Sequence, residues 1–299
     1  MKNKKKIIFI GSVILSKIFL KTLLKQKKKI IVSGIISDSK NKINADFADL
    51  RQVSKKIPYL DTPNINSKIT FKWINDINPD YIFCFGYSNL ITNPILKKYQ
   101  GKIVGFHPSN LPVIRGRNPI IWSIILNKKF SGTNFFIINK KPDAGNIIDH
   151  CKVLIKKSMN ASDLYNKIIM TGQKRIPIML NKLFLKNKFL KNVSKINLRK
   201  RTSGEEIIDW RMSNKFIHNL VRALSKPYIG TYFIYKKRKY FLEKTSIIKI
   251  KSIKESNYEY GRVVKTFNNK SFIVKCGEGL IKVIKTKPKI NVKSKLNLF

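Results

Sequence analysis

Residues 105–145 read GFHPSNLPVIRGRNPIIWSIILNKKFSGTNFFIINKKPDAG, and the fold can be predicted outward from this stretch. An apolar pair, Ile103 and Val104, precedes it, and Pro108 follows His107. We expect His107 where a strand ends, because a residue before proline is displaced from the helical region. Residues 119–125 predict a helix opened by proline, residues 133–138 a strand, and residues 142–145 a turn. In α/β sheets, ligands bind at the carboxyl ends of strands.

Two features of this stretch indicate chemistry. Asp143 follows His107 by 36 positions, and the two meet at one sheet edge if strand 133–138 lies beside the strand that ends at His107. A histidine paired with a carboxylate is suited to proton transfer. Arg115 and Arg117 alternate around Gly116 near the predicted helix start, a place suited to a phosphate or another anion. Each motif alone is common in structural turns; their order and spacing together predict a functional site.

Strands and helices alternate through the N-terminal half. Apolar runs predict strands at 7–10, 30–36 and 81–85. The alternation predicts an α/β domain of the Rossmann type, with an open, mostly parallel sheet and helices on both faces. No Gly-x-Gly-x-x-Gly follows the first strand, so a dinucleotide cofactor is not indicated. Short strands at 232–235, 240–242, 261–264, 272–274 and 280–284 predict a small β-rich barrel at the end of the chain.

The pattern resembles the formyltetrahydrofolate-dependent formyltransferases. That family carries Asn-x-His, then Leu-Pro and Arg-Gly, and later an Asp-x-Gly turn. The matching residues here are His107, Leu111-Pro112, Arg115-Gly116 and Asp143-Ala144-Gly145. Residues 208–210, 217–223 and 227–230 resemble the entry into the family's OB-like C-terminal domain. One member is missing, because Gly105 stands where the family has the asparagine that helps to bind and polarise the formyl oxygen.

The resemblance implies an enzyme that takes its formyl group from 10-formyltetrahydrofolate. His107 and Asp143 would be catalytic, and Asn118 is the first candidate to replace the missing asparagine, ahead of Asn110 or a backbone amide. The folate pocket would be formed by Asp143 together with Phe85, Gly86, Tyr87, Leu90 and Ile91. The acceptor would be bound by Ser109, Arg115, Gly116 and Arg117. No metal is implied.

The resemblance covers nearly the whole chain, with a catalytic domain at 1–185, a linker at 186–204 and an OB-like domain at 205–299. Family members that act on nucleotide-linked amino sugars show Arg-Gly-Arg-x-Pro and then tryptophan, as Arg117, Pro119 and Trp122 do here. The methionyl-tRNA enzymes instead continue Arg-Gly-Ala-Ala-Pro. We therefore expect a nucleotide-linked amino sugar as the acceptor, with methionyl-tRNA as the alternative. Because of Gly105, a non-catalytic folate-binding descendant also stays open.

The composition adds a strong positive charge. The 299 residues carry 62 Lys and Arg against 16 Asp and Glu, a formal net charge of +46. Lysine is spread along the chain with abundant Ile and Asn, which indicates a coding bias, although an RNA-binding protein with an OB-like tail is a third hypothesis. Three separated cysteines without CxxC spacing predict neither a disulfide framework nor a zinc site. No segment approaches the roughly 20 apolar residues of a membrane span, so we expect a cytoplasmic protein, and a homodimer stays open.

Overall fold

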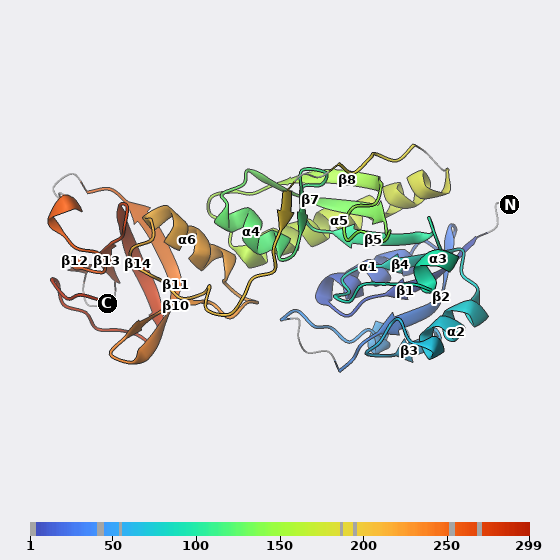
Figure 1. Cartoon of the computed structure of the whole chain (residues 1–299), viewed down its shortest axis with the longest axis horizontal. Coiled ribbons are helices and arrows are strands. Elements are labelled where there is room, and N and C mark those ends of the chain that lie inside the picture. The colour runs from blue at the N-terminus through green and yellow to red at the C-terminus, as the bar shows by residue number, and fades with distance from the viewer. Residues whose placement is uncertain are drawn as a thin grey trace. The chain divides into compact units, whose positions relative to one another are not determined.

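The computed structural model describes residues 4–40, 45–53, 56–185, 188–193, 196–250, 255–267 and 271–299. The chain divides into two compact units (Figure 1). The first consists of Met1–Pro119, Phe130–Leu154 and Tyr165–Arg199, and the second of Ile120–Lys129, Ile155–Leu164 and Lys200–Phe299. Two helices, α4 Pro119–Ile125 and α5 Ala161–Phe184, have residues in both units.

The first unit is built on a seven-stranded sheet with the order β3-β2-β1-β4-β5-β7-β8. Its strands are β1 Lys5–Ile10, β2 Ile30–Ser37, β3 Tyr59–Asp61, β4 Tyr81–Cys84, β5 Ile103–His107, β7 Phe130–Ile137 and β8 Ile147–Leu154. Strands β1 to β5 run parallel, whereas β7 and β8 are antiparallel to their neighbours. Helices α1 Ile14–Leu24, α2 Lys68–Ile77 and α3 Ile95–Lys98 and the turn η1 Arg51–Val53 connect the parallel strands.

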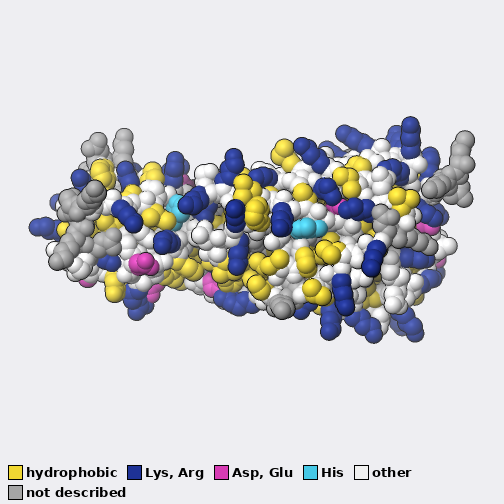
Figure 2. All heavy atoms as spheres, turned by 90° about the horizontal axis from the view of Figure 1, so that it is seen from above, with side chains coloured by type: hydrophobic (Ala, Val, Ile, Leu, Met, Phe, Trp, Pro, Cys, Tyr) yellow, Lys and Arg dark blue, Asp and Glu magenta, His cyan; other side chains and the backbone are white. Residues whose placement is uncertain are grey.

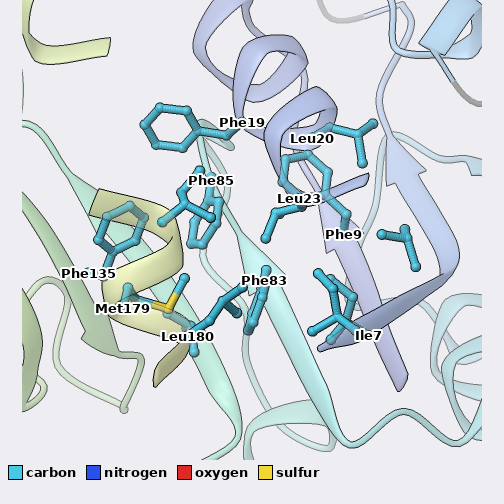
Figure 3. Packing of buried hydrophobic residues seen from close by; sticks show 14 of the residues in the cluster. Ile7, Phe9, Phe19, Leu20, Leu23, Phe83, Phe85, Phe135, Met179 and Leu180 are labelled. Atoms are coloured by element: carbon cyan, nitrogen blue, oxygen red, sulfur yellow. The ribbon is translucent and has the colours of Figure 1, made fainter. Parts of the chain in front are cut away.

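Alternation along β1 divides the core of this unit between the two faces of the sheet. Ile7 and Phe9 join a cluster formed with α1 and α5, in which aromatic rings pack closely around Phe85 (Figure 3). Ile8 and Ile10 join the cluster on the opposite face, together with residues of α2 and α3. A strand that is buried on both faces reads as a continuous apolar run, which is what the sequence shows.

Local signals set the ends of α2. The hydroxyl of Ser67 accepts a hydrogen bond from the backbone N–H of Thr70 and so caps the first turn. At the other end Asn78 adopts a left-handed conformation with φ of 48°, and Pro79 follows it. The chain therefore leaves the helix at a defined place and enters β4, whose end forms part of the candidate site.

The second unit carries a five-stranded antiparallel sheet with the order β10-β11-β14-β13-β12. Its elements are α6 Asn214–Ala223, β10 Thr231–Tyr235, β11 Arg238–Ile248, η2 Glu255–Asn257, β12 Val263–Phe267, β13 Ser271–Lys275 and β14 Leu280–Lys287. Trp210 and Ile217 pack in one buried cluster with Phe233 and Val274. The sheet confirms the β-rich C-terminal domain that the sequence predicts.

The α/β prediction is confirmed, and so is the position of the helix at 119–125 and of the strand at 133–138, which begins earlier, at Phe130. Among the strands that the sequence did not predict are two short ones beside the Arg-Gly-Arg loop. They are β6 Ile114–Gly116 and β9 Ile196–Leu198, which pair with each other in parallel. The division at 186–204 stays a prediction, and part of that segment lies outside the described residues.

Candidate active site

His107 ends β5, and its neighbours in the sheet fix the direction of its side chain. Opposite residues of paired strands share one face, and along a strand every second residue does. His107 pairs with Asn134 of β7, and Gly105 pairs with Phe136. These four residues therefore lie on one face, whereas Phe106 and Phe135 pack in the aromatic cluster of the other face. The carboxyl end of β5 thus carries an imidazole where a core strand would carry an apolar side chain.

The turn between β7 and β8 places the carboxylate of Asp143 beside this histidine. The Oδ1 atom of Asp143 lies 3.6 Å from Nδ1 of His107. Asp143 has a φ of 52°, and its carbonyl oxygen accepts a hydrogen bond of 2.7 Å from Nδ2 of Asn192. Gly145 is required two residues later, since a Cβ atom there would lie 1.5 Å from the carbonyl oxygen of Ile137. The structure therefore brings together the two residues that the sequence predicted to meet.

The surroundings of His107 set its charge. The side chain is 8% exposed, and burial lowers its pKa, while the Asp143 carboxylate acts in the opposite direction. The imidazole is consequently neutral at neutral pH. Its Nε2 atom is buried and has no hydrogen-bond partner among the described residues. A buried polar atom without a partner is costly, so Nε2 is available to a bound reactant.

Gly105, which replaces the family asparagine, faces an occupied space. A Cβ atom at this position would lie 2.7 Å from Cζ of Phe136 and 3.0 Å from Cγ1 of Ile138. Phe136 also packs against the buried side chains of Leu111 and Ile147. The side chains of Phe136 and Ile138 therefore occupy the place where an asparagine side chain would begin. This contact was not predictable from the sequence, because Phe136 lies in an apolar run with no visible alternation.

Two asparagines lie in the loop that follows β5. Asn118 is exposed and has a φ of 50°, directly before Pro119 opens α4. Asn110 is more enclosed. Its backbone carbonyl oxygen accepts hydrogen bonds from the backbone N–H groups of Val113 and Ile114 at 2.8 and 3.1 Å. The Oδ1 atom of Asn110 is buried and has no partner in the described part of the chain. Asn110, three positions after His107, is thus the better enclosed of the two amides.

The Arg-Gly-Arg segment is held by the connection that leads out of α5. Strand β6 pairs with β9, and Arg117 donates its backbone N–H to the carbonyl oxygen of Leu198 at 2.9 Å. Gly116 has a φ of 112°, and a Cβ atom there would lie 2.2 Å from the same oxygen. Ser109 is buried, and its hydroxyl donates to the carbonyl oxygen of Ile114 at 2.6 Å. Gly116 and Ser109 therefore hold the loop, while Arg115 is half-buried and Arg117 is exposed.

The predicted folate residues follow β4. Phe85 is fully buried in the aromatic core, and its carbonyl oxygen accepts a hydrogen bond of 2.6 Å from the hydroxyl of Ser16. Gly86 has a φ of 73°, and a Cβ atom there would lie 2.4 Å from Val13. Ile91 is buried and Leu90 is 58% exposed. Phe85 and Gly86 thus shape the turn, whereas Leu90 offers an apolar surface.

The remaining member of the predicted folate set is Tyr87, which is half-buried and packs against the cluster that contains Ile8, Ile10 and residues of α2 and α3. Burial raises the pKa of its hydroxyl, which therefore stays protonated at neutral pH.

No group of three His, Cys, Asp or Glu side chains able to hold a metal ion occurs among the described residues. No helix in the same part of the chain is long and apolar enough to cross a bilayer.

A mostly parallel sheet with a histidine and a carboxylate at its strand ends, followed by a small antiparallel domain, defines a class of two-domain α/β proteins with a site for proton-assisted chemistry. Within this class, the chain belongs to the formyl transferase family. Residues 5–180 match the formyl transferase domain, and residues 200–298 match the formyl transferase C-terminal domain. The resemblance drawn from residues 105–145 is thereby confirmed.

Several known proteins are similar to this chain. The bifunctional polymyxin resistance protein ArnA of Wigglesworthia glossinidia brevipalpis is 26% identical over 280 residues, which are 90% of this chain and 40% of that protein. The chain thus spans less than half the length of this relative. WlaRD, a sugar 3N-formyltransferase solved with dTDP and 5-N-formyl-THF, has a TM-score of 0.67 at 20% identity, covering 96% of this chain and all of WlaRD (100%).

The N-formyltransferase of Helicobacter canadensis, solved with folinic acid and dTDP-3-aminofucose, has a TM-score of 0.69 at 17% identity. The likeness covers 94% of this chain and 99% of that one. At such identities the two structures show that the fold is shared over nearly the whole length. They leave the acceptor of this chain to be inferred from its own residues.

Proposed function

We propose that this protein is an N-formyltransferase that moves a formyl group from 10-formyltetrahydrofolate to the amine of a nucleotide-linked amino sugar. The observation that carries the proposal is the buried, neutral His107, with Asp143 beside Nδ1 and with Nε2 left without a partner among the described residues. WlaRD and the Helicobacter canadensis protein, which share the fold, were solved with formylated folates and with dTDP or a dTDP-sugar. That likeness supports both the donor and the acceptor class.

The reaction is acyl transfer. The neutral amine nitrogen attacks the formyl carbon, a C–N bond forms, and a tetrahedral oxyanion results. The bond between that carbon and the folate nitrogen then breaks, which gives the N-formyl product and tetrahydrofolate. Nε2 of neutral His107 takes the proton released by the amine and returns it to the leaving nitrogen, while Asp143 holds Nδ1 and stabilises the imidazolium formed in between.

The oxyanion needs a donor in place of the absent asparagine. Losing one such donor costs about 100- to 1000-fold in rate in well-studied acyl-transfer enzymes. Asn118 is the candidate that the sequence favoured, and the enclosure of Asn110 makes it a second one. Both amides lie in the loop that begins at His107, and Phe136 blocks an amide at position 105 itself.

Arginines in and next to the paired strands β6 and β9 support the acceptor class. Gly116 pairs with Leu198, so Arg117 follows opposite Arg199, and both residues are exposed. Arg115 lies within β6, two residues before Arg117, and is half-buried. Guanidinium groups bind phosphate oxygens in bidentate fashion. Three arginines on one short ribbon therefore suit the diphosphate of a nucleotide sugar.

The test is a panel of acceptors. Tetrahydrofolate release from 10-formyltetrahydrofolate is followed with nucleotide-linked 3-amino and 4-amino sugars, and separately with methionyl-tRNA. Turnover on a sugar that falls when Arg117 or Arg199 becomes alanine is the expected result. Turnover on the tRNA alone would contradict the sugar assignment. Folate binding without turnover on any acceptor would show a non-catalytic descendant.

A further inference from the structure

A row of polar side chains crosses three neighbouring strands at the candidate site. His107 of β5 pairs with Asn134 of β7, and Asn134 pairs with His150 of β8. Asn134 is fully buried, although its side chain carries two donors and an acceptor. Such a residue is stable inside a protein only when its polar atoms are satisfied, so its partners show what it holds.

The amide of Asn134 holds the backbone that carries His107. Its Nδ2 atom donates to the carbonyl oxygen of His107 at 2.9 Å and to that of Ser109 at 2.5 Å. The carbonyl oxygen between them, of Pro108, accepts a hydrogen bond of 3.2 Å from the hydroxyl of Ser131. Three successive carbonyl groups of the catalytic loop are therefore bound by side chains of β7.

The same strand leaves room for the loop to approach. A Cβ atom at Gly132 would lie 2.5 Å from the carbonyl oxygen of Ser109 and 3.1 Å from that of Cys151. No side chain fits between the strand and the loop at this point. The loop thus rests directly on the backbone of β7, between the side chains of Ser131 and Asn134.

His150 fixes the orientation of the amide. Because both hydrogens of Asn134 Nδ2 are directed to carbonyl oxygens, Oδ1 is left as the acceptor. Nδ1 of His150 lies 2.6 Å from this Oδ1 and must be the donor. A neutral His150 therefore carries its proton on Nδ1, and a rotated amide would place Oδ1 against two carbonyl oxygens.

From these contacts we infer that Asn134 and His150 are positioning residues, which hold the loop 107–109 so that the imidazole of His107 faces the reactants. The inference rests on the proposed function for its effect on turnover. Its structural part, the direction of the Asn134–His150 hydrogen bond and its control of His107, is independent of any activity.

The first test needs no substitution. The chain has only three histidines, so their ring signals can be separated in ¹⁵N-labelled protein. Burial lowers the pKa of His150, which is therefore neutral at about pH 8. The expected result is that His150 is the Nδ1–H tautomer. An Nε2–H tautomer in the wild-type protein would overturn the inference.

The second test compares two variants of β7. Asn134→Leu removes both donors and keeps the branched, four-atom shape of the side chain. Thr133→Val is the control, because Thr133 is equally buried, lies next in the strand and has no partner for Oγ1 among the described residues. We expect Asn134→Leu to shift the ring signals of His107 and to lower kcat about 100-fold with little change in KM, since small misplacements of a catalytic group have effects of that size. Wild-type His107 signals or a kcat within about twofold of the control would overturn the inference.

If Asn134→Leu does not fold, His150→Phe takes its place, since it keeps Asn134 and removes only the donor on Nδ1. The same shift of the His107 signals is expected, and its absence would count against the positioning role. An enzyme without formyl transfer on any acceptor would refute the proposed function and leave the two spectroscopic results to decide the inference.

Discussion

Two features of the surroundings of His107, its burial and the nearby carboxylate of Asp143, have opposite effects on its pKa. Burial favours the neutral ring, and Asp143 favours the protonated one. The neutral ring prevails near neutral pH, as the proposed role as a base requires, and the carboxylate would stabilise an imidazolium formed by proton uptake. A histidine tuned in this way is suited to accept a proton and release it again within one turnover.

Replacing Asp143 tests this pairing through a pH profile. In the wild-type protein kcat should fall on the acid side with a midpoint below the ordinary histidine value of 6.5, because protonated His107 accepts no proton. Asp143→Asn removes the group that raises the pKa of His107, so the midpoint should move to still lower pH, and kcat should fall by about 100- to 10,000-fold. Asp76→Asn, on an exposed position of α2, is the control. A near-normal rate for Asp143→Asn would refute the pairing.

We expect the effects of substitutions at Gly105 and Phe136 on stability to be coupled, because the two residues are in contact. Gly105→Asn alone forces a side chain into the ring of Phe136 and should destabilise the protein by about 1–3 kcal/mol in thermal or urea unfolding. The double variant Gly105→Asn with Phe136→Ala relieves this clash. A double-mutant cycle should therefore show a favourable coupling energy between the two changes. Strict additivity would mean that Phe136 does not occupy the place of the missing amide.

The two loop asparagines can be compared directly. If Asn110 supplies the oxyanion donor, Asn110→Ala should lower kcat by about 100-fold or more, and Asn118→Ala should not. Burial favours this outcome, since Asn110 is half-buried with its Oδ1 atom enclosed, whereas Asn118 is exposed. The reverse result would assign the donor to Asn118, and unchanged turnover in both variants would leave it to a backbone amide.

At the level of elements, the segment that follows α5 contacts both the turn that carries Asp143 and the Arg-Gly-Arg loop. After α5, Leu190 bridges to Ile147 at the start of β8, Asn192 binds the carbonyl oxygen of Asp143, and β9 pairs with β6. The segment predicted as a linker at 186–204 thus contacts the turn that carries Asp143 and then the Arg-Gly-Arg loop.

Gly116 allows this connection to be tested. Gly116→Ala places a methyl group 2.2 Å from Leu198 and should separate β6 from β9, so that KM for the acceptor rises more than KM for the folate. Gly101→Ala is a matched control, because Gly101 also has a positive φ, of 74°, but no atom within 4 Å of the added Cβ. Equal KM values in the two variants would show that β9 does not support the acceptor site.

Some of these elements were predictable from the sequence, and others were not. Apolar runs such as 7–10 and 81–85 predict strands reliably, and Pro119 and Pro79 mark helix boundaries. Strand β9 has three residues in a polar segment, and it forms because a distant strand offers backbone groups. Contacts of this kind leave no periodic signal. The meeting of His107 and Asp143 was predictable from strand order, whereas Asn134 and His150 were not, because their roles depend on register.

At the scale of the whole molecule, the net charge of +46 is distributed, not concentrated. Lys and Arg side chains are scattered over the face shown in Figure 2, with apolar and other side chains between them. Such a surface attracts anions in general and discriminates little among them. Under the proposed function, we expect specificity for a nucleotide sugar to come from β6 and β9, and we expect the general charge to make binding weaken with salt.

Formyl transfer to a nucleotide-linked amino sugar is tested most directly by following the formyl carbon. 10-Formyltetrahydrofolate labelled with ¹³C in the formyl group is mixed with the protein and a nucleotide-linked amino sugar, and NMR records where the label goes. We predict that it appears in an amide on the sugar with the wild-type protein and stays on the folate with Asp143→Asn. Label that stays on the folate with the wild-type protein and every sugar tested, or that reaches the sugar equally fast with Asp143→Asn, would contradict the account.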